Sequence, residues 1–267
     1  SSGGTAAGCS VPVDPTRERS PIPGITRNVF LLGIVSLFTD ASTEMIYPLI
    51  PLFLVQVLGA PVSVLGFIEG LAEATASVLK GFSGWFSDRL GVRRPLVIFG
   101  YSLAAVTKPL LALAGGWGLV LAARVIDRFG KGVRGTPRDA IIADSSEERT
   151  RGRAFGFHRS IDQTGAIIGP LLALPMLAFF HNDYRLVFVA AFLPAALGVL
   201  TLFLVRETGT RVTAAMRPGF HLPRELRGFV LIMLIFTIGN SSDLFLILRA
   251  RSLGFSAQEV VLVFTVF

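Results

Sequence analysis

Charged side chains recur inside one long apolar stretch of the sequence, residues 117–143. Residues 127–139 read Asp-Arg-Phe-Gly-Lys-Gly-Val-Arg-Gly-Thr-Pro-Arg-Asp. At about 100° of rotation per residue, the charged positions fall within roughly a 140° arc of a helix, opposite its apolar positions. Acids and bases on one helix face can bind a charged solute, exchange protons or form ion pairs. The candidates for such chemistry are Arg124, Asp127, Arg128 and Lys131.

Carboxylates interrupt two further apolar stretches. Asp40 and Glu44 lie in residues 29–54, and Glu69 and Glu73 lie in residues 62–86. Two carboxylates one helical turn apart in a low dielectric resist being ionised together, so at least one of them can take up a proton. We hypothesise that Asp40, Glu44 or Glu73 is a proton site, which pH-driven transport by the neutralised variants would test.

The charged positions must be placed by the helices that carry them. At a rise of about 1.5 Å per residue, Asp40, Glu73 and the turn from Arg124 to Arg128 come to a similar depth. This predicts a polar interior lined by the helices over 29–54, 62–86 and 117–143. Two alternatives stay open: the charges form structural ion pairs, or the helix that begins at residue 117 ends near Gly132 and its later charges are cytoplasmic.

The composition predicts a membrane protein. The chain is 52% hydrophobic and 16% charged, with a mean hydropathy of +0.64. A helix of about twenty apolar residues crosses a bilayer core. The expected helices are residues 29–54, 62–86, 95–114, 117–143, 155–180, 184–205 and 229–248, and an eighth begins near Gln258. The fold class is therefore all-α and polytopic.

Arginines concentrate in alternate connections between these helices, and positive charge in short connections stays on the cytoplasmic side. This predicts a cytoplasmic N-terminus. Four regions follow: residues 1–27 as a disordered cytoplasmic N-terminus, 28–205 as a six-helix bundle, 206–227 as a cytoplasmic linker, and 228–267 as the first helix and a truncated second helix of another bundle.

Several other classes of protein lack support in the sequence. The basic residues are explained by topology, so no nucleic-acid partner is expected. A phosphate-binding G-x-x-x-x-G-K-[ST] is missing, as is any paired nucleophile and base. The three histidines are widely separated and Cys9 is the single cysteine, so neither a metal site nor a disulfide within the chain is expected. We therefore expect neither an enzyme nor a cofactor.

A motif follows the second expected helix. It reads Gly84-Trp-Phe-Ser-Asp88-Arg89-Leu-Gly91-Val-Arg93-Arg94. This resembles the major facilitator signature G-x-L-[AS]-D-R-x-G-R-[KR], although Phe86 replaces the usual Leu and Val92 interrupts the basic run. In that family the Gly permits close helix contact, and the Asp meets a helix terminus of the other half to latch the inner gate.

The fifth expected helix contains a second motif. Gly156, Gly165, Gly169 and Pro170 resemble the antiporter signature of the same family, G-x8-G-x3-G-P-x2-G, with Ala173 in place of the final Gly. Small residues let membrane helices approach closely. Asp162 lies within this motif and shares a helix face with His158. The helix-four signature of the family fits poorly, because Ile126 stands where its Arg is expected.

The resemblance implies a fragment of a twelve-helix secondary transporter, of a prokaryotic branch whose substrates are not identified by the motifs. It implies proton-coupled export of a small molecule by alternating access, in a bacterial or archaeal cytoplasmic membrane. The expected partners are the bilayer, the substrate, protons and the missing C-terminal half. A uniporter or symporter for a small polar or anionic solute, and a transport-inactive receptor or scaffold, remain alternatives.

Overall fold

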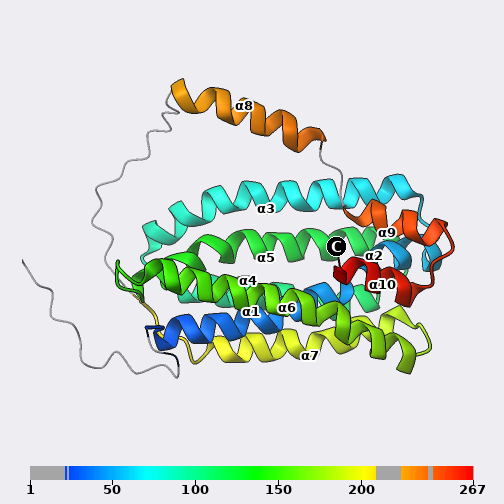
Figure 1. Cartoon of the computed structure of the whole chain (residues 1–267), viewed down its shortest axis with the longest axis horizontal. Coiled ribbons are helices and arrows are strands. Elements are labelled where there is room, and N and C mark those ends of the chain that lie inside the picture. The colour runs from blue at the N-terminus through cyan, green and yellow to red at the C-terminus, as the bar shows by residue number, and fades with distance from the viewer. Residues whose placement is uncertain (1–21, 23, 209–223, 240–242, 267) are drawn as a thin grey trace, which may run out of the picture.

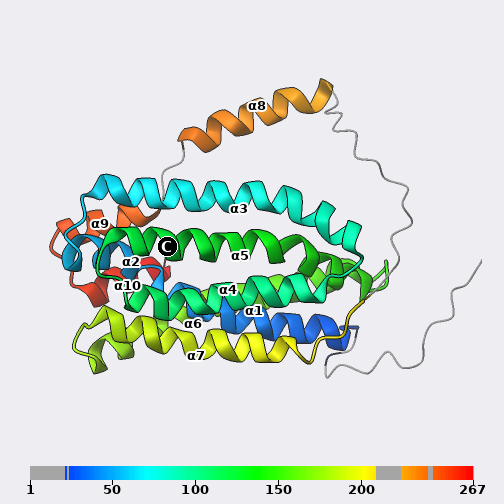
Figure 2. The same ribbon diagram turned by 180° about the vertical axis from the view of Figure 1, so that it is seen from behind.

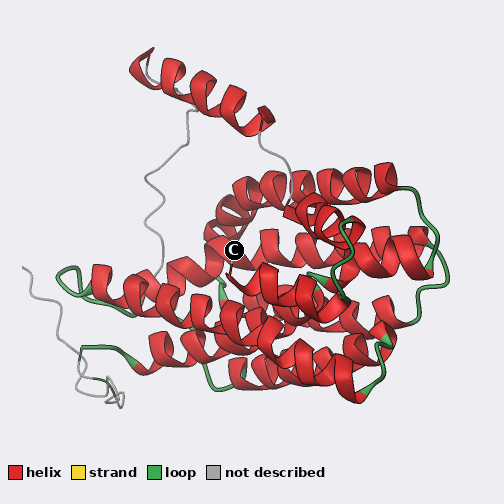
Figure 3. Cartoon of the chain, turned by 45° about the vertical axis from the view of Figure 1, so that its right-hand side comes forward, coloured by secondary structure: helices red, strands yellow, loops and turns green. Residues whose placement is uncertain are grey.

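The computed structural model describes residue 22 and residues 24–208, 224–239 and 243–266. Its described elements are helices, and most of those within residues 24–208 are joined by short connections (Figure 3). They are α1 (Arg27–Ile46), α2 (Leu49–Leu52), the π-helical turn η1 (Phe53–Val57), α3 (Val62–Leu90), α4 (Arg94–Ala112), α5 (Trp117–Asp144), α6 (Arg151–Phe179), α7 (Tyr184–Leu202), α8 (Arg224–Gly239), α9 (Asp243–Ser252) and α10 (Ala257–Val266).

Six long helices form one bundle with their axes roughly aligned (Figure 1). In this bundle α5 packs along both α3 and α4, α4 packs along α7, and α1 packs along both α7 and α6. Therefore α4 and α7 cover one side of α5 and α1, while α3 and α6 flank them. We call the opposite side of α1 and α5 the front of the bundle. Any polar group on this front lies between α3 and α6.

Five of the described helical spans are long and apolar enough to cross a membrane. They are Arg27–Val57, Val62–Ser87, Arg94–Ala112, Arg151–Phe179 and Tyr184–Leu202. The helix α5 has 28 residues but is much less apolar than these spans, because it carries the charged positions. Its packing against α3 and α4 goes with the burial of Arg124, Asp127, Arg128 and Arg134, whereas Lys131 is exposed.

Local chemistry sets the breaks between the helices. Pro48 separates α1 from α2, because proline cannot donate the helical hydrogen bond. Gly91 follows α3 with φ of 64°, the left-handed conformation that glycine adopts without a steric penalty. Asp183 caps α7 by accepting a hydrogen bond from the backbone N–H of Arg185 at 2.9 Å. Gly91 and Asp183 lie in connections that the sequence predicts, whereas the break at Pro48 falls inside the single helix predicted over residues 29–54.

Close backbone contacts hold α4 against α5. A Cβ atom added at Gly100 would lie 2.5 Å from the carbonyl oxygen of Gly130, and one at Gly130 would lie 2.5 Å from that of Gly100. The two helices thus meet at a pair of facing glycines, the geometry that small residues make possible in membranes. This contact fixes the register of α5 against the bundle.

The C-terminal segment differs from the expected pair of helices. The single helix predicted over residues 229–248 is wrong: α8 ends at Gly239 and α9 begins at Asp243, with residues 240–242 outside the described part. The helix α8 also begins at Arg224, five residues before the expected start. Figures 1 and 2 show α8 beyond α3, whereas α9 and α10 lie at one end of the bundle. There α10 packs on α6 and α2.

Candidate functional site

A buried ion pair joins α3 to α5. The Nε and Nη2 atoms of Arg124 donate to the two carboxylate oxygens of Glu69 at 2.8 and 2.7 Å. Both side chains are almost fully removed from solvent, and the guanidinium also lies 5.4 Å from the ring centroid of Tyr47 on α1. A bidentate pair fixes distance and orientation together, so it locks α3 to α5 in one geometry.

A second buried pair joins α4 to α5. Lys108 Nζ lies 3.1 Å from Asp127 Oδ1 and 3.3 Å from Thr43 Oγ1 of α1. The Lys108 side chain is 1% exposed. The ammonium therefore meets a carboxylate inside the bundle rather than extending toward the membrane surface. Asp127 is thus paired with a cation that comes from α4.

The next turn of α5 is more open. Arg128 Nε lies 2.9 Å from Glu73 Oε1 of α3, and the Glu73 side chain is 58% exposed. Lys131 is exposed, and neither it nor Glu44 has an ion-pair partner within 4 Å among the described residues. Glu44 is partly buried on α1. These groups can still receive a proton or a charged solute.

Two carboxyl groups meet on either side of one hydroxyl. Ser36 Oγ of α1 lies 2.6 Å from Asp162 Oδ1 of α6 and 3.2 Å from Asp40 Oδ2. Asp162 also accepts a hydrogen bond from Arg159 at 3.0 Å. The expected polar interior lined by three helices therefore gains a fourth, α6. Asp40 approaches another carboxyl group rather than the arginines of α5.

These contacts divide the predicted residues into two sets. Asp127, Arg128 and the pair of Glu69 and Arg124 are buried and have ionic partners, in agreement with the structural interpretation left open by the sequence. The more accessible set lies on the front of α1, α3, α5 and α6 and consists of Asp40, Glu44, Glu73, Lys131 and Asp162. This accessible set is the candidate functional site.

The first signature motif ends α3 and begins α4. A Cβ atom added at Gly84 would lie 2.9 Å from Thr136 Cγ2, so this glycine admits α5 against α3. Arg89 lies 5.3 Å from the Trp85 ring centroid. Asp88 lies in the last turn of α3, and its side chain is outside the described part of the structure.

The two arginines after Gly91 anchor the start of α4. The backbone N–H groups of Arg93 and Arg94 donate to the two carboxylate oxygens of Glu207 at 3.1 and 2.9 Å. The Arg93 side chain forms an ion pair with Asp144, and Arg94 donates to the Phe203 carbonyl at 2.7 Å. The motif thus ties the ends of α4, α5 and α7 together.

The second motif places α6 directly on α1. Added Cβ atoms at Gly165 and Gly169 would lie 2.6 Å from the Leu37 carbonyl oxygen and 2.5 Å from that of Ala41. Pro170 is buried beside them. A Cβ atom at Gly156 would meet nothing within 4 Å in the described chain. The two inner glycines set the distance between Asp162 and the polar residues of α1.

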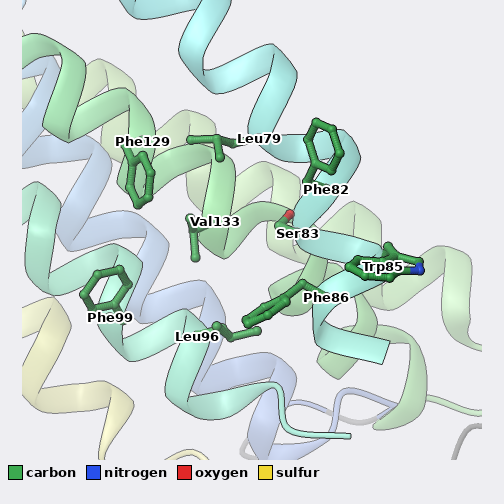
Figure 4. Close-up of a pocket in the computed structure, with 9 residues that line it drawn as sticks. All are labelled: Leu79, Phe82, Ser83, Trp85, Phe86, Leu96, Phe99, Phe129 and Val133. Atoms are coloured by element: carbon green, nitrogen blue, oxygen red, sulfur yellow. The ribbon is translucent and has the colours of Figure 1, made fainter. Parts of the chain in front are cut away.

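An apolar groove lies apart from the charged site. Figure 4 shows its lining, which comes from one end of α3, the start of α4 and the back of α5: Leu79, Phe82, Ser83, Trp85, Phe86, Leu96, Phe99, Phe129 and Val133. Aromatic and aliphatic side chains dominate this surface. Phe129 and Val133 belong to the apolar face of α5, opposite its charged positions.

Tyr101 was not singled out by the sequence. Arg134 lies 4.1 Å from the Tyr101 ring centroid, and both side chains are buried between α4 and α5. A cation over an aromatic face is stabilised without a carboxylate. The helical register of α4 would have placed Tyr101 seven residues, or two turns, before Lys108 on its inner face.

The described residues contain no cluster of three or more metal-ligating side chains.

Comparison with known proteins gives consistent matches. The family model described as Major Facilitator Superfamily matches residues 32–267. An uncharacterized MFS-type transporter of Methanocaldococcus jannaschii is 35% identical over 232 residues, which cover 85% of this chain and 57% of that protein. The multidrug resistance protein MdtH of Aeromonas hydrophila is 29% identical over 207 residues, which cover 77% of this chain and 51% of that protein.

The fold is also similar to solved structures. A POT family transporter, crystallised in complex with a thioalcohol-conjugated peptide, matches with a TM-score of 0.62 at 17% identity. The match covers 88% of this chain and 49% of that one. The chain therefore spans about half the length of the relatives and structures that it matches.

Proposed function

The chain belongs to the Major Facilitator Superfamily, and on this premise we propose that the full-length protein exports a small molecule against an inward flow of protons. Its helices would line one side of a central path, and a second bundle would line the other. Rocking of the two bundles would expose the path to each side of the membrane in turn. The name of the MdtH relative supports export as the direction of transport.

The observation that carries this proposal is the accessible set of titratable groups on the front of the bundle. Ionisable groups at membrane depth are costly unless they have partners or face water. Glu44 and Lys131 have no ionic partner among the described residues, and Glu73 is more than half exposed. Carboxyl groups in such a place can bind and release protons as the path opens and closes.

The buried pairs have a different role in the proposal. Glu69 with Arg124, and Lys108 with Asp127, hold α3, α4 and α5 as one unit. A rigid unit is what a rocking-bundle mechanism needs, because the motion must occur between bundles rather than within one. The residues of these pairs are therefore not assigned to proton transfer.

Lys131 gives a specific reason to retain a second function. An exposed ammonium without a carboxylate partner in the described part of the chain attracts an anionic solute. The alternative is a uniporter or symporter for a small anionic or polar solute. A transport-inactive receptor would show neither activity.

The test is transport by the full-length protein in proteoliposomes under an imposed pH gradient. Ethidium, a neutral amino acid and an organic anion would serve as the probes, in separate assays. The export proposal predicts that one probe moves against the proton flow and that neutralising Asp40 or Glu44 uncouples it. Movement of the anion without a pH gradient, or in the same direction as the protons, would favour the alternative, and no movement of any probe would oppose both.

The arginine distribution supports a cytoplasmic N-terminus in a prokaryotic cytoplasmic membrane. On this basis the end of the bundle that carries Arg93, Arg94 and the start of α6 faces the cytoplasm. The regions proposed from the sequence, a cytoplasmic N-terminus over residues 1–27 and a linker over 206–227, belong to the same topology, although residues 1–21 and 209–223 lie outside the described part of the chain. A membrane-impermeant label directed to a cysteine at Arg151, applied to intact cells and to inverted vesicles, would test this orientation.

A further inference from the structure

The interface of α1 and α6 brings two carboxyl groups from different helices to one point. Gly165 and Gly169 allow the helix backbones to touch, with an added Cβ atom only 2.6 or 2.5 Å from a carbonyl oxygen of α1. The two helices are packed backbone to backbone, so α6 cannot move away from α1 without losing this contact. Asp40 and Asp162 are therefore held near each other by backbone packing.

When both carboxyl groups are ionised, too few hydrogens are present to make both hydrogen bonds between them and Ser36. Ser36 Oγ lies 2.6 Å from Asp162 Oδ1 and 3.2 Å from Asp40 Oδ2. A hydroxyl has one hydrogen to donate, and an ionised carboxylate has none. Ser36 can then satisfy only one of the two carboxylates. One added proton completes the set, because a protonated Asp40 donates to Ser36 while Ser36 donates to Asp162.

The surrounding charges differ on the two sides of the hydroxyl. Asp162 accepts a hydrogen bond from Arg159 of its own helix, and Arg138 of α5 and His158 of α6 also face it. The cations that face Asp40 are Arg134 and Lys131 of α5. Arg134 is engaged with the Tyr101 ring and Lys131 is exposed. Among the described residues Asp162 has a direct ionic partner and Asp40 has none, so the added proton belongs on Asp40.

We propose that Asp40 and Asp162 bind one exchangeable proton between them, with Ser36 as the bridge. The proton arrives from water and binds Asp40. It can pass on when Asp40 donates to Ser36 Oγ as the Ser36 hydrogen moves to Asp162, and it leaves Asp162 to water. As the coupling proton of transport, this pair rests on the proposed function, whereas its proton binding does not.

Proton binding can be measured without transport. Infrared difference spectra of the purified full-length protein, recorded across a pH titration, report the carbonyl stretch of a protonated carboxyl group. The wild type should show a band that titrates as one proton. Both Asp40→Asn and Asp162→Asn should abolish it, because removing either carboxyl leaves the other without a negative neighbour. Glu148→Gln, at an exposed position, is the matched control and should keep the band.

The bridge has its own test. Ser36→Ala keeps both carboxyl groups and removes the hydroxyl, so the band should remain but change its frequency and titrate at a different pH. Monodisperse elution in detergent would confirm that each variant is folded. A band that persists unchanged in Asp162→Asn, or in Asp40→Asn, would overturn the shared proton.

Transport then separates this inference from the proposed function. If the wild type shows the shared band but moves no probe with the pH gradient, the proton site stands and the export proposal fails. If the wild type exports a probe and Asp162→Asn retains both the band and full coupling, export stands and the shared site fails.

Discussion

Glu69 and Arg124 face each other across α3 and α5 with both carboxylate oxygens engaged, at 2.8 and 2.7 Å. Neither side chain has appreciable contact with solvent. A charge in this position has no replacement partner, because water cannot reach it. This ion pair therefore contributes to the stability of the bundle. It also helps to position Glu73 and Lys131, the more accessible groups that follow on α3 and α5.

Glu69→Gln should destabilise the bundle strongly. The substitution leaves a buried guanidinium uncompensated, which costs about 3–5 kcal/mol in comparable buried pairs. Thermal unfolding of the full-length protein in detergent measures the effect. Glu148→Gln is the control for the same chemical change at an exposed position, and it should cost much less. Equal effects of the two variants would mean that the Glu69 pair is not buried as described.

A paired apolar substitution should recover most of the loss. Replacing Glu69 with Leu and Arg124 with Met removes both charges and keeps comparable volume, and such replacements are often neutral or stabilising. The double variant should therefore melt well above Glu69→Gln. A double variant as unstable as the single one would assign the loss to packing rather than to the uncompensated charge.

Lys108→Met should also lower stability, because Asp127 would be left as an unpaired carboxylate inside the bundle. The midpoint of thermal unfolding should fall clearly below that of the wild type. Lys80→Met tests the same chemical change at an exposed position of α3 and should leave the midpoint nearly unchanged. If Lys108 instead extended to the membrane surface, both variants would behave alike.

Gly169→Val should separate α6 from α1. A Cβ atom at this position would lie 2.5 Å from the Ala41 carbonyl oxygen and 2.8 Å from the Met45 amide nitrogen, and neither backbone atom can move alone. We expect poor folding yield and a lower unfolding midpoint. Gly156→Val lies on the same helix in open space and should be tolerated. A tolerated Gly169→Val would show that the two backbones are not in contact.

Glu207→Ala should loosen the start of α4. Its carboxylate accepts from two N–H groups at the helix N-terminus, where caps contribute about 0.5–2 kcal/mol. A modest fall in the unfolding midpoint is expected, together with faster amide hydrogen exchange at residues 93–97. The control Glu148→Ala should change neither quantity. Unchanged exchange in Glu207→Ala would exclude the cap.

The sequence predicts the bundle well because its signals are local. Apolar runs near the length of a bilayer predict the six helices from Arg27 to Leu202 to within a few residues at most ends. Of the motif glycines, Gly84 lies where α3 meets α5, and Gly165 and Gly169 lie where α6 meets α1, whereas Gly156 meets nothing within 4 Å in the described chain. The division into α8 and α9 was missed because residues 229–248 contain no proline, although the polar run from Gly239 to Asp243 interrupts their apolar composition.

The pairing of the charges was harder to predict. Helical periodicity places Glu69, Glu73 and Arg124 on polar faces, but it does not say which carboxylate meets which cation. Lys108 pairs with Asp127 and Asp40 approaches Asp162 because of contacts between helices that are distant in sequence. Such partners depend on the rotation of each helix about its axis, which is fixed by packing.

The central claim is that the accessible charged set faces a shared aqueous path. The most direct measurement is labelling of single cysteines by a charged, membrane-impermeant thiol reagent, in a full-length background with Cys9→Ser and every other cysteine removed. Cysteines placed at Glu44, Glu73 and Lys131 should be labelled at similar rates, while cysteines at Phe99 and Leu193, on the outward faces of α4 and α7, should resist. Resistance at the three charged positions, or equal labelling at all five, would contradict the aqueous path.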